Sequence, residues 1–371
     1  MQKFKKFISR FSAKQIILFL VAVLSLILFL VVTIWSNALT SKLSDQQAAI
    51  RWDEDGGAAQ VSCFLAESVE IDEFAIMSFE KELEKLLNES MTAQETGSTV
   101  PKRLFIDAYS SQGTISIESE AGKLDANAIG IGGDFFLMHP LHLMSGQYFS
   151  GNDLMKDSII LDEDSAWQLF GSVDIAGMSV MIGGIPHYVA GVIERPQGKF
   201  AETAGLDKPI VYVSNETLTQ YGQGTGINTY EVVAPNPVNK FVYHAVKEKL
   251  GVAETDMVVV ENSTRYSLAG LIPIILDFGK RSMQNTAVRF PYWENIARGY
   301  EDIRALFLLL QFILLLIPII LLVIWIIIKW KHRTFTGKDV WNSILDFKDK
   351  SVQYVVMKKK KRQNILEEDD D

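Results

Sequence analysis

The sequence predicts an α+β fold in which two transmembrane helices flank one large extracytoplasmic domain. Residues 16–36 and residues 305–328 each form an apolar run without a charged residue. A helix rises about 1.5 Å per residue, so about 20 apolar residues cross the hydrocarbon core of a bilayer. Lipid satisfies no backbone amide, so both runs are expected to be helical. Between them, residues 37–304 carry the periodicities of amphipathic helices and half-buried strands.

Basic residues flank both runs. They are Lys3, Lys5, Lys6, Arg10 and Lys14 before the first run, and Lys329, Lys331, Arg333 and Lys358–Arg362 after the second. Because positive flanks stay in the cytoplasm, we predict a two-pass protein of the cell membrane with a cytoplasmic N-terminus (1–15) and a cytoplasmic tail (329–371). A cleaved signal peptide is the alternative for the first run, but a signal core usually holds only about 7–15 apolar residues.

Charge and cysteine content limit which functions the central domain, residues 37–304, can have. The chain has a formal net charge of −9, and its first 14 residues hold only basic charges, so the acidic excess lies in the central domain. An acidic domain argues against nucleic acid as a partner. The one cysteine, Cys63, cannot form an intramolecular disulfide, and its alternating apolar surroundings predict a buried side chain.

The two ends of the central domain predict a shared lobe near the membrane. Asn37–Trp52 lacks Gly and Pro and is expected to extend the first span as a helix. The first part then predicts a strand at 60–65, a helix at 71–87 and a hairpin of 104–109 with 114–118 around Ser110–Gly113. The last part predicts a strand at 229–234, a helix at 237–250 and a strand at 257–261, the pattern of a βαβ crossover. We therefore assign residues 37–125 and 226–300 to one membrane-proximal lobe.

The middle of the domain, residues 126–225, predicts an inserted β-rich lobe. Strands are expected at 158–161 and 210–213, with a short helix that Asp162 or Asp164 caps and that ends at Phe170-Gly171. Gly183-Gly184 between alternating runs at 178–182 and 187–193 predicts a hairpin. Further on, Leu268–Leu276 is apolar but too short to span, and is expected to be buried beneath the lobe or to form a contact surface.

Motifs that would support catalysis are absent from the sequence. No P-loop pattern occurs, so the chain is not itself a P-loop ATPase. The run at Gly130, Gly132 and Gly133 lacks the last glycine of a dinucleotide fingerprint. His139 and His142 stand three apart but have no nearby Cys or carboxylate pair, so a metal site is disfavoured. We predict a protein that is not an enzyme, with no catalytic residue, no cofactor and no metal site.

Residues 127–193 resemble the extracytoplasmic core domain of MacB/FtsX-type ABC transporter permeases. The matching residues are 127–136, Gly146, Phe149, Asp153, 159–161, Ala166, 169–171, 175–177 and 180–193. The resemblance implies a MacB-like two-lobed extracytoplasmic domain, moved by ATP hydrolysis in a cytoplasmic subunit for export or mechanotransmission. Family permeases have three spans after this domain, whereas this chain has one. The chain is therefore expected to be an accessory subunit with a separate ABC ATPase and a multi-span FtsX-like permease as partners.

The segment that enters the second span is the candidate coupling site. Pro291 opens a helix that is expected to continue into the span. The candidate coupling or interface residues on it are Trp293, Ile296, Tyr300, Arg304 and Pro318, and Pro318 is expected to kink the span.

Two other classes of protein share the two-span layout. A polysaccharide chain-length regulator also has two spans around an outer domain, but usually with long outer helices and a Pro-rich segment before the second span. A cell-surface scaffold or sensor is the third hypothesis, although no signalling domain follows the second span.

Overall fold

The computed structural model describes residues 12–92, 103–278, 288–331 and 341. The chain divides into two compact units, one formed by Met1–Leu30 with Phe312–Asp371 and the other by Val31–Gln311, which we call the central domain. Most of the predicted cytoplasmic N-terminus and tail lies outside the described residues.

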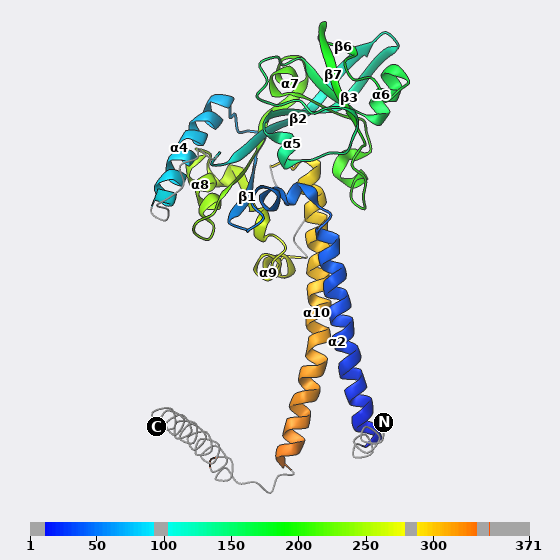
Figure 1. Cartoon of the computed structure of the whole chain (residues 1–371), viewed down its shortest axis with the longest axis vertical. Helices are drawn as coiled ribbons and strands as arrows, with labels where there is room; N and C mark the ends of the chain where they lie inside the picture. The colour runs from blue at the N-terminus through cyan, green and yellow to red at the C-terminus, as the bar shows by residue number, and fades with distance from the viewer. Residues whose placement is uncertain (1–11, 93–102, 279–287, 332–340, 342–371) are drawn as a thin grey trace, which may run out of the picture. The chain divides into compact units, whose positions relative to one another are not determined.

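Among the described residues, two helices are long and apolar enough to cross a membrane, α2 (Ala13–Thr40) and α10 (Tyr292–Lys331) (Figure 1). They contain the predicted spans 16–36 and 305–328. In their most apolar stretches only 6% and 0% of the residues are buried, as expected where lipid covers the side chains. The Ser25 hydroxyl of α2 donates to the Leu314 carbonyl of α10 at 2.8 Å. With the mixed sheet described next, the predicted fold class of an α+β domain flanked by two apolar helices is confirmed.

One ten-stranded sheet, of order β10-β1-β9-β2-β3-β8-β5-β7-β4 with β6 pairing β2 and β7, underlies the central domain. Its first four strands are β1 (Ala58–Leu65), β2 (Ile106–Ser119), β9 (Gln223–Pro235) and β10 (Met257–Glu261). Helix α4 (Glu73–Thr92) connects β1 to β2, and α8 (Phe241–Lys249) connects β9 to β10. Because β9 and β10 both run antiparallel to β1, they are parallel to each other. This split βαβ arrangement is that of ferredoxin-like folds, and it confirms the predicted crossover.

Helices α4 and α8 lie side by side against this part of the sheet (Figure 1). Their apolar faces form one cluster with β1 and β9, which includes Ile76, Leu83 and Val246. Cys63 in β1 is fully buried there, as predicted. Desolvation raises the pKa of its thiol to about 12, so the thiol stays protonated and unreactive at neutral pH.

The long hairpin of β2 with β3 (Gly122–Gly133) continues the sheet into the second half of the domain. The remaining strands are β4 (Leu143–Gly146), β5 (Ser158–Asp162), β6 (Ser179–Ile182), β7 (Ile185–Ile193) and β8 (Ile210–Ser214). Helices α6 (Glu163–Phe170) and α7 (Asn215–Tyr221) pack on them. The lobe boundaries that we propose, at 125–126 and 225–226, fall within β3 and β9, so these two lobes share one sheet.

Two short-range predictions in this half are confirmed. The Asp162 side chain accepts from the Ser165 amide at 2.9 Å and caps α6, which ends at Gly171 with φ of 69°. Gly183 and Gly184 have φ of 59° and 79° between β6 and β7, as a tight hairpin turn requires.

The predicted hairpin around Ser110–Gly113 is wrong. Strand β2 runs through these residues without turning, and its pairing with β9 shifts register between Ser110 and Ser111 and between Ser111 and Gly113. A β-bulge absorbs the small polar residues that the sequence presents as a turn. Gly113 is needed there, because a Cβ atom on it would lie 2.3 Å from the Gln223 carbonyl oxygen.

The predicted continuation of the first span to Trp52 is also wrong. Helix α2 ends at Thr40, and the chain turns through η1 (Ser44–Gln46) before α3 (Ala48–Trp52). The Gln60 side chain accepts from the Ala48 amide at 2.9 Å and donates to the Asp45 carbonyl at 2.6 Å, which ties this turn to β1. Short-range propensity cannot anticipate this contact with a distant strand.

The remaining elements are short. They are α5 (Phe135–Met138), the π-helix η2 (Glu202–Leu206), η3 (Glu254–Asp256), η4 (Asn262–Thr264) and α9 (Leu268–Leu276). Helix α9 is not buried beneath the domain as one prediction had it, because only Leu271 on it is buried.

The pairing of Tyr109 in β2 with Gly132 in β3 gives a stability prediction. A Cβ atom on Gly132 would lie 2.0 Å from the Tyr109 ring, so Gly132→Ala forces the ring away from its buried neighbours. We expect a loss of about 1–3 kcal/mol in the free energy of unfolding, measured by thermal unfolding of the full chain in detergent. Gly224→Ala is the matched control, because its Cβ atom meets neighbours only from 3.5 Å outward. Equal losses in the two variants would contradict the packing described.

Candidate coupling site

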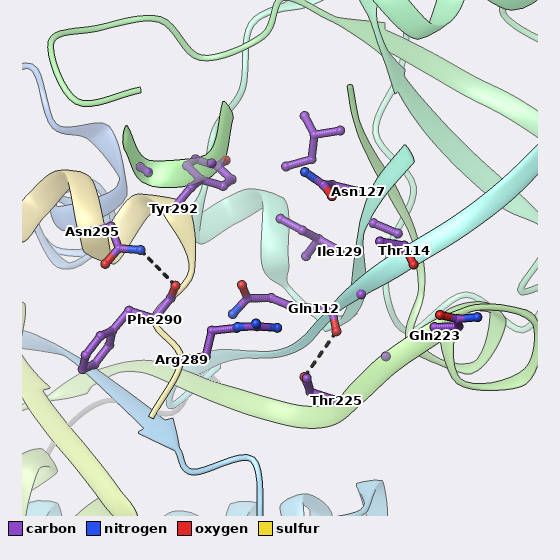
Figure 2. Close-up of a pocket in the computed structure, with 16 residues that line it drawn as sticks. Gln112, Thr114, Asn127, Ile129, Gln223, Thr225, Arg289, Phe290, Tyr292 and Asn295 are labelled. Atoms are coloured by element: carbon purple, nitrogen blue, oxygen red, sulfur yellow. Dashed lines mark hydrogen bonds between the residues drawn. The ribbon is translucent and has the colours of Figure 1, made fainter. Parts of the chain in front are cut away.

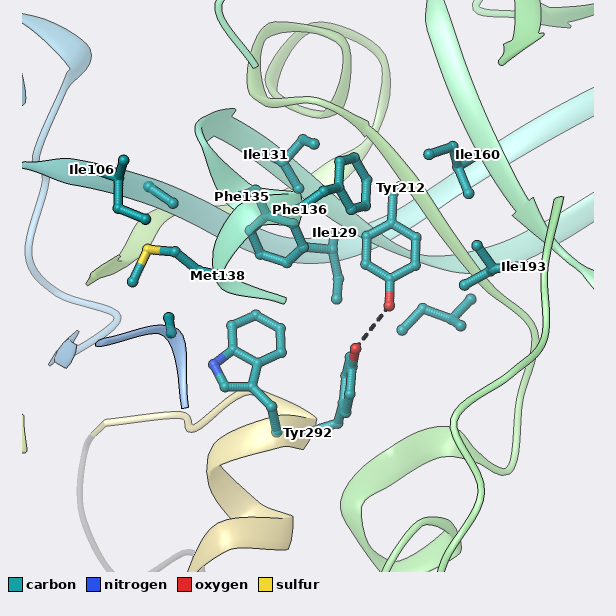
Figure 3. Packing of buried hydrophobic residues seen from close by; sticks show 14 of the residues in the cluster. Ile106, Ile129, Ile131, Phe135, Phe136, Met138, Ile160, Ile193, Tyr212 and Tyr292 are labelled. Atoms are coloured by element: carbon teal, nitrogen blue, oxygen red, sulfur yellow. Dashed lines mark hydrogen bonds between the residues drawn. The ribbon is translucent and has the colours of Figure 1, made fainter. Parts of the chain in front are cut away.

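The first turn of α10 is embedded in the core of the central domain. Trp293 is 1% exposed, and its ring centroid lies 5.6 Å from that of Phe135 and 4.4 Å from that of His139. The neighbouring Tyr292 shares a 2.9 Å hydrogen bond between hydroxyls with Tyr212 of β8 (Figure 3). Phe135, Phe136 and Met138 of α5 and residues of β3 complete this cluster. The beginning of α10 is therefore part of the domain core.

Four of the five predicted site residues lie on the part of α10 that belongs to the central domain. Ile296 packs against the same cluster as Trp293. One turn later the Tyr300 ring meets the Phe200 ring edge-on at 5.4 Å. The Arg304 guanidinium donates to the Ser36 hydroxyl at 2.7 Å and to the Asn37 side chain at 2.8 Å, which joins α10 to the end of α2.

Pro318 does not belong to this group. It lies further along α10, in the other compact unit, and the helix continues through it.

A buried ion network, which the sequence analysis missed, holds the base of α10 to the sheet. Arg265, just after η4, donates to both carboxylate oxygens of Glu294 at 2.6 and 2.9 Å and to Glu301 at 2.5 Å. The Arg265 and Glu294 side chains are 2% and 1% exposed. Arg298 donates to Glu294 at 2.7 Å and stacks 3.7 Å above the Phe290 ring. Two carboxylates of α10 thus bind a single buried guanidinium, and Arg298 of the same helix pairs with one of them.

A second buried chain of hydrogen bonds continues from Arg265 across the sheet. Arg265 donates to Asn262 at 3.2 Å, Asn262 donates to Ser62 at 2.7 Å, and Ser62 donates to Glu231 at 2.5 Å. The other Glu231 oxygen lies 2.5 Å from His139 Nε2, and His139 Nδ1 lies 3.0 Å from Asp45 in η1. The network therefore connects α10 with the turn that follows α2.

The pKa values of these groups follow from burial and charge. Burial alone would lower the pKa of His139, but the Glu231 and Asp45 carboxylates outweigh it and raise the value to about 9. Burial would raise the pKa of Glu294, whereas Arg265 and Arg298 lower it. Both groups are therefore charged at neutral pH, and the network consists of paired charges.

A cavity of about 570 Å³ lies beside the first turn of α10 (Figure 2). Tyr292 and Asn295 line it from α10, and Gln112, Asn127 and Thr225 line it from the sheet. Arg289 is the one charged residue among the described residues that line it. The cavity leaves one side of the first turn unpacked, while Trp293 on α10 is enclosed by the core.

The two histidines that the sequence places three apart diverge. His139 is fully buried in the network, whereas the His142 side chain is 75% exposed and lies 3.2 Å from Glu194. Within the described ranges, no group of three His, Cys, Asp or Glu residues is arranged to hold a metal ion. One sequence signal of the network was available: Glu294, Arg298 and Glu301 repeat at helical spacing beside the buried Trp293.

Comparisons with known proteins identify relatives of this chain. A family model described as the MacB-like periplasmic core domain matches residues 17–247. The macrolide export ATP-binding/permease protein MacB of Chromobacterium violaceum is 35% identical over 78 residues, which are 20% of this chain and 12% of that protein. The protein of the same name from Pasteurella multocida is 28% identical over 123 residues, 32% of this chain and 19% of that protein. The chain therefore spans less than one-fifth of the length of these relatives.

Among solved structures, the chain is similar to the periplasmic region of MacB from Actinobacillus actinomycetemcomitans. The two share 16% identity over 57% of this chain and 93% of that one, with a TM-score of 0.37.

Removal of Arg265 tests the ion network. Arg265→Met leaves the Glu294 and Glu301 carboxylates buried without their main partner, so we expect a loss of about 3–5 kcal/mol in the free energy of unfolding. Arg289→Met is the control, because Arg289 and its partner Glu67 have side chains 59% and 51% exposed. An exposed pair contributes about 0–1 kcal/mol. Chemical denaturation of the full chain in detergent measures both, and equal losses would contradict the account.

The pKa of His139 gives a pH prediction. This pKa is about 9 in the folded chain against a reference of 6.5, so the folded state holds the proton more tightly. The stabilisation is complete below pH 6.5 and is lost as the pH rises through 9, a fall of about 3 kcal/mol. Burial and the neighbouring Glu80 raise the pKa of Asp107 to about 8, which adds to the same decline.

The contribution of His139 is therefore measured as the difference between variants in how stability changes with pH. We expect His139→Gln to have a shallower loss of stability between pH 6.5 and 9 than the parent chain, and His142→Gln to keep the parent slope. Denaturation curves across this pH range measure the slopes. Parallel curves for the parent and His139→Gln would show that His139 is not held as a cation.

Proposed function

Because this chain belongs to the MacB-like periplasmic core domain family, we propose that it is a non-catalytic membrane subunit of an ABC transporter. The family supports a membrane subunit of this class. In the mechanism that we propose, ATP hydrolysis by a separate ABC ATPase moves the membrane helices, and α10 passes that movement to the central domain. The chain itself binds and orients, and performs no chemical step.

The continuity of α10 is the observation that carries the proposal. One helix, Tyr292–Lys331, contains both the apolar run 305–328 and the first turn that is buried in the domain core. A helix is stiff along its axis because each amide is bonded one turn away. A displacement of the apolar run therefore reaches Trp293 without an intervening loop.

The residues of the coupling site have distinct proposed roles. Trp293 and Ile296 anchor the helix in the core, and Arg265 fixes its rotation by binding both Glu294 and Glu301. Tyr300 contacts the segment around Phe200, and Arg304 ties α10 to α2 so that the two helices move together. Pro318 remains a proposed hinge of the span.

The proposal also includes the membrane topology of the chain and the partners that it binds. The basic flanks support cytoplasmic termini and an extracytoplasmic central domain in the cell membrane. We propose an ABC ATPase and a multi-span FtsX-like permease as partner chains, because the relatives of this chain are named ATP-binding/permease proteins. The family match over 17–247 favours this function over a polysaccharide chain-length regulator.

Co-purification from native membranes tests the assembly. The tagged full chain, extracted into nanodiscs, is expected to bring down an ABC ATPase and a multi-span permease, identified by mass spectrometry. A tag on an unrelated two-span protein controls for trapping of membrane proteins. A ring of identical chains with no ATPase would support the chain-length regulator and overturn the proposal.

The coupling role gives a second prediction. A fluorophore on Leu154→Cys, a site 98% exposed, reports on the central domain without competition from the buried Cys63. We expect ATP to change its emission in the assembled complex. Ile303→Gly with Leu306→Gly should abolish the change, because glycine weakens a helix by about 1 kcal/mol per residue relative to alanine. The matched control is alanine at both positions, and the account fails if the glycine and alanine pairs respond alike.

A further inference from the structure

Helix α9 presents an apolar stripe that no described residue of the central domain covers. Leu268, Ile272 and Leu276 are 63%, 47% and 77% exposed and recur every four residues, so they share one face. No charged residue occurs from Tyr266 to Leu276. A contiguous exposed apolar face of this kind marks a surface that meets another apolar phase.

The position of α9 along α10 identifies that phase. The Arg304 guanidinium donates to the Tyr266 carbonyl at 3.2 Å, and the Tyr266 hydroxyl donates to the Ala297 carbonyl at 3.3 Å. Arg304 is the last charged residue before the uncharged run 305–328. Tyr266 directly precedes Ser267, the residue that caps the beginning of α9. Helix α9 therefore begins at the level where α10 enters the bilayer.

The orientation of α9 and the aromatic residues near it agree with a position at the bilayer surface. In Figure 1, α9 is seen nearly end-on beside α10, so it lies across the axis of α10, as a helix in the plane of a membrane surface does. Trp35, 60% exposed, lies next to Phe307 of α10 with ring centroids 5.5 Å apart. Exposed tryptophan and tyrosine at one level are typical of the lipid headgroup region.

We propose that α9 is an interfacial membrane helix whose Leu268, Ile272 and Leu276 insert into the outer leaflet beside α10. The inference rests on α10 crossing the bilayer, which is part of the proposed function, and is independent of the coupling role and of any partner. Leu306 and Leu309, at the beginning of the uncharged run of α10, are 51% and 42% exposed. By this contact the lipid surface holds the base of the central domain at a fixed height and orientation.

Position-specific quenching in nanodiscs tests the proposal. The full chain carries a fluorophore on Ile272→Cys, and the probes are a lipid with a nitroxide on its acyl chain and a water-soluble quencher. We expect the lipid to quench about half or more of the emission, because interfacial helices bury their apolar face about 5–10 Å into the headgroup and acyl boundary. The water-soluble quencher should have little effect.

Two control positions make every outcome decisive. Phe74→Cys on α4, 76% exposed, should be quenched only from water, and Leu309→Cys on α10 only from lipid. Quenching of the Ile272 label from water alone, or from neither side because another protein covers α9, overturns the proposal while Leu309 still reports the span. If Leu309 is not quenched by lipid, the membrane-spanning role of α10 fails, and the inference fails with it.

Discussion

The buried guanidinium of Arg265 is the interaction on which the rest of the structure depends. It binds Glu294 and Glu301, which lie about two helical turns apart on α10, while Asn262 and Gln46 bond it from the domain side. Desolvation offsets much of the attraction in a buried ion pair, so such a network adds less to stability than its distances suggest. Its partners, however, are satisfied together in only one rotation of α10. We infer that its main role is to fix how the helix enters the domain.

The polar network and the aromatic core act on the same helix turn in different ways. Trp293 contributes apolar burial, which is non-directional, whereas Arg265 and Glu294 contribute directional bonds. His139 belongs to both, because its ring lies 4.4 Å from the Trp293 ring in a tilted arrangement and its nitrogens bond Glu231 and Asp45. Since Asp45 follows α2 and Glu294 belongs to α10, both helices leave the domain from one continuous buried network. The cavity beside Tyr292 lies next to this same turn.

Local signals in the sequence predicted much of the fold but little of the site. The apolar runs, the Asp162 cap, the Gly183-Gly184 turn and the βαβ crossover all depend on neighbouring residues, and all are present. The turn predicted at Ser110–Gly113 is a bulged strand, because its pairing with distant β9 overrides local preference. The helical spacing of Trp293, Ile296 and Tyr300 predicts a helix that continues into the second span, and the structure places Trp293 in the first turn of such a helix. Arg265 was missed because its partners lie in other segments, and only the fold brings them together.

Hydrogen exchange along α10 tests the central claim most directly, since it reports whether the helix enters the domain without a flexible joint. The full chain in nanodiscs is incubated in deuterated buffer, and peptides covering residues 294–304, which precede the uncharged run, are compared with those of β9 and of the exposed turn at 197–199. A continuous, buried helix predicts protection of 294–304 close to that of β9. Exchange as fast as in the exposed turn would reveal a flexible joint at the membrane surface and contradict the account.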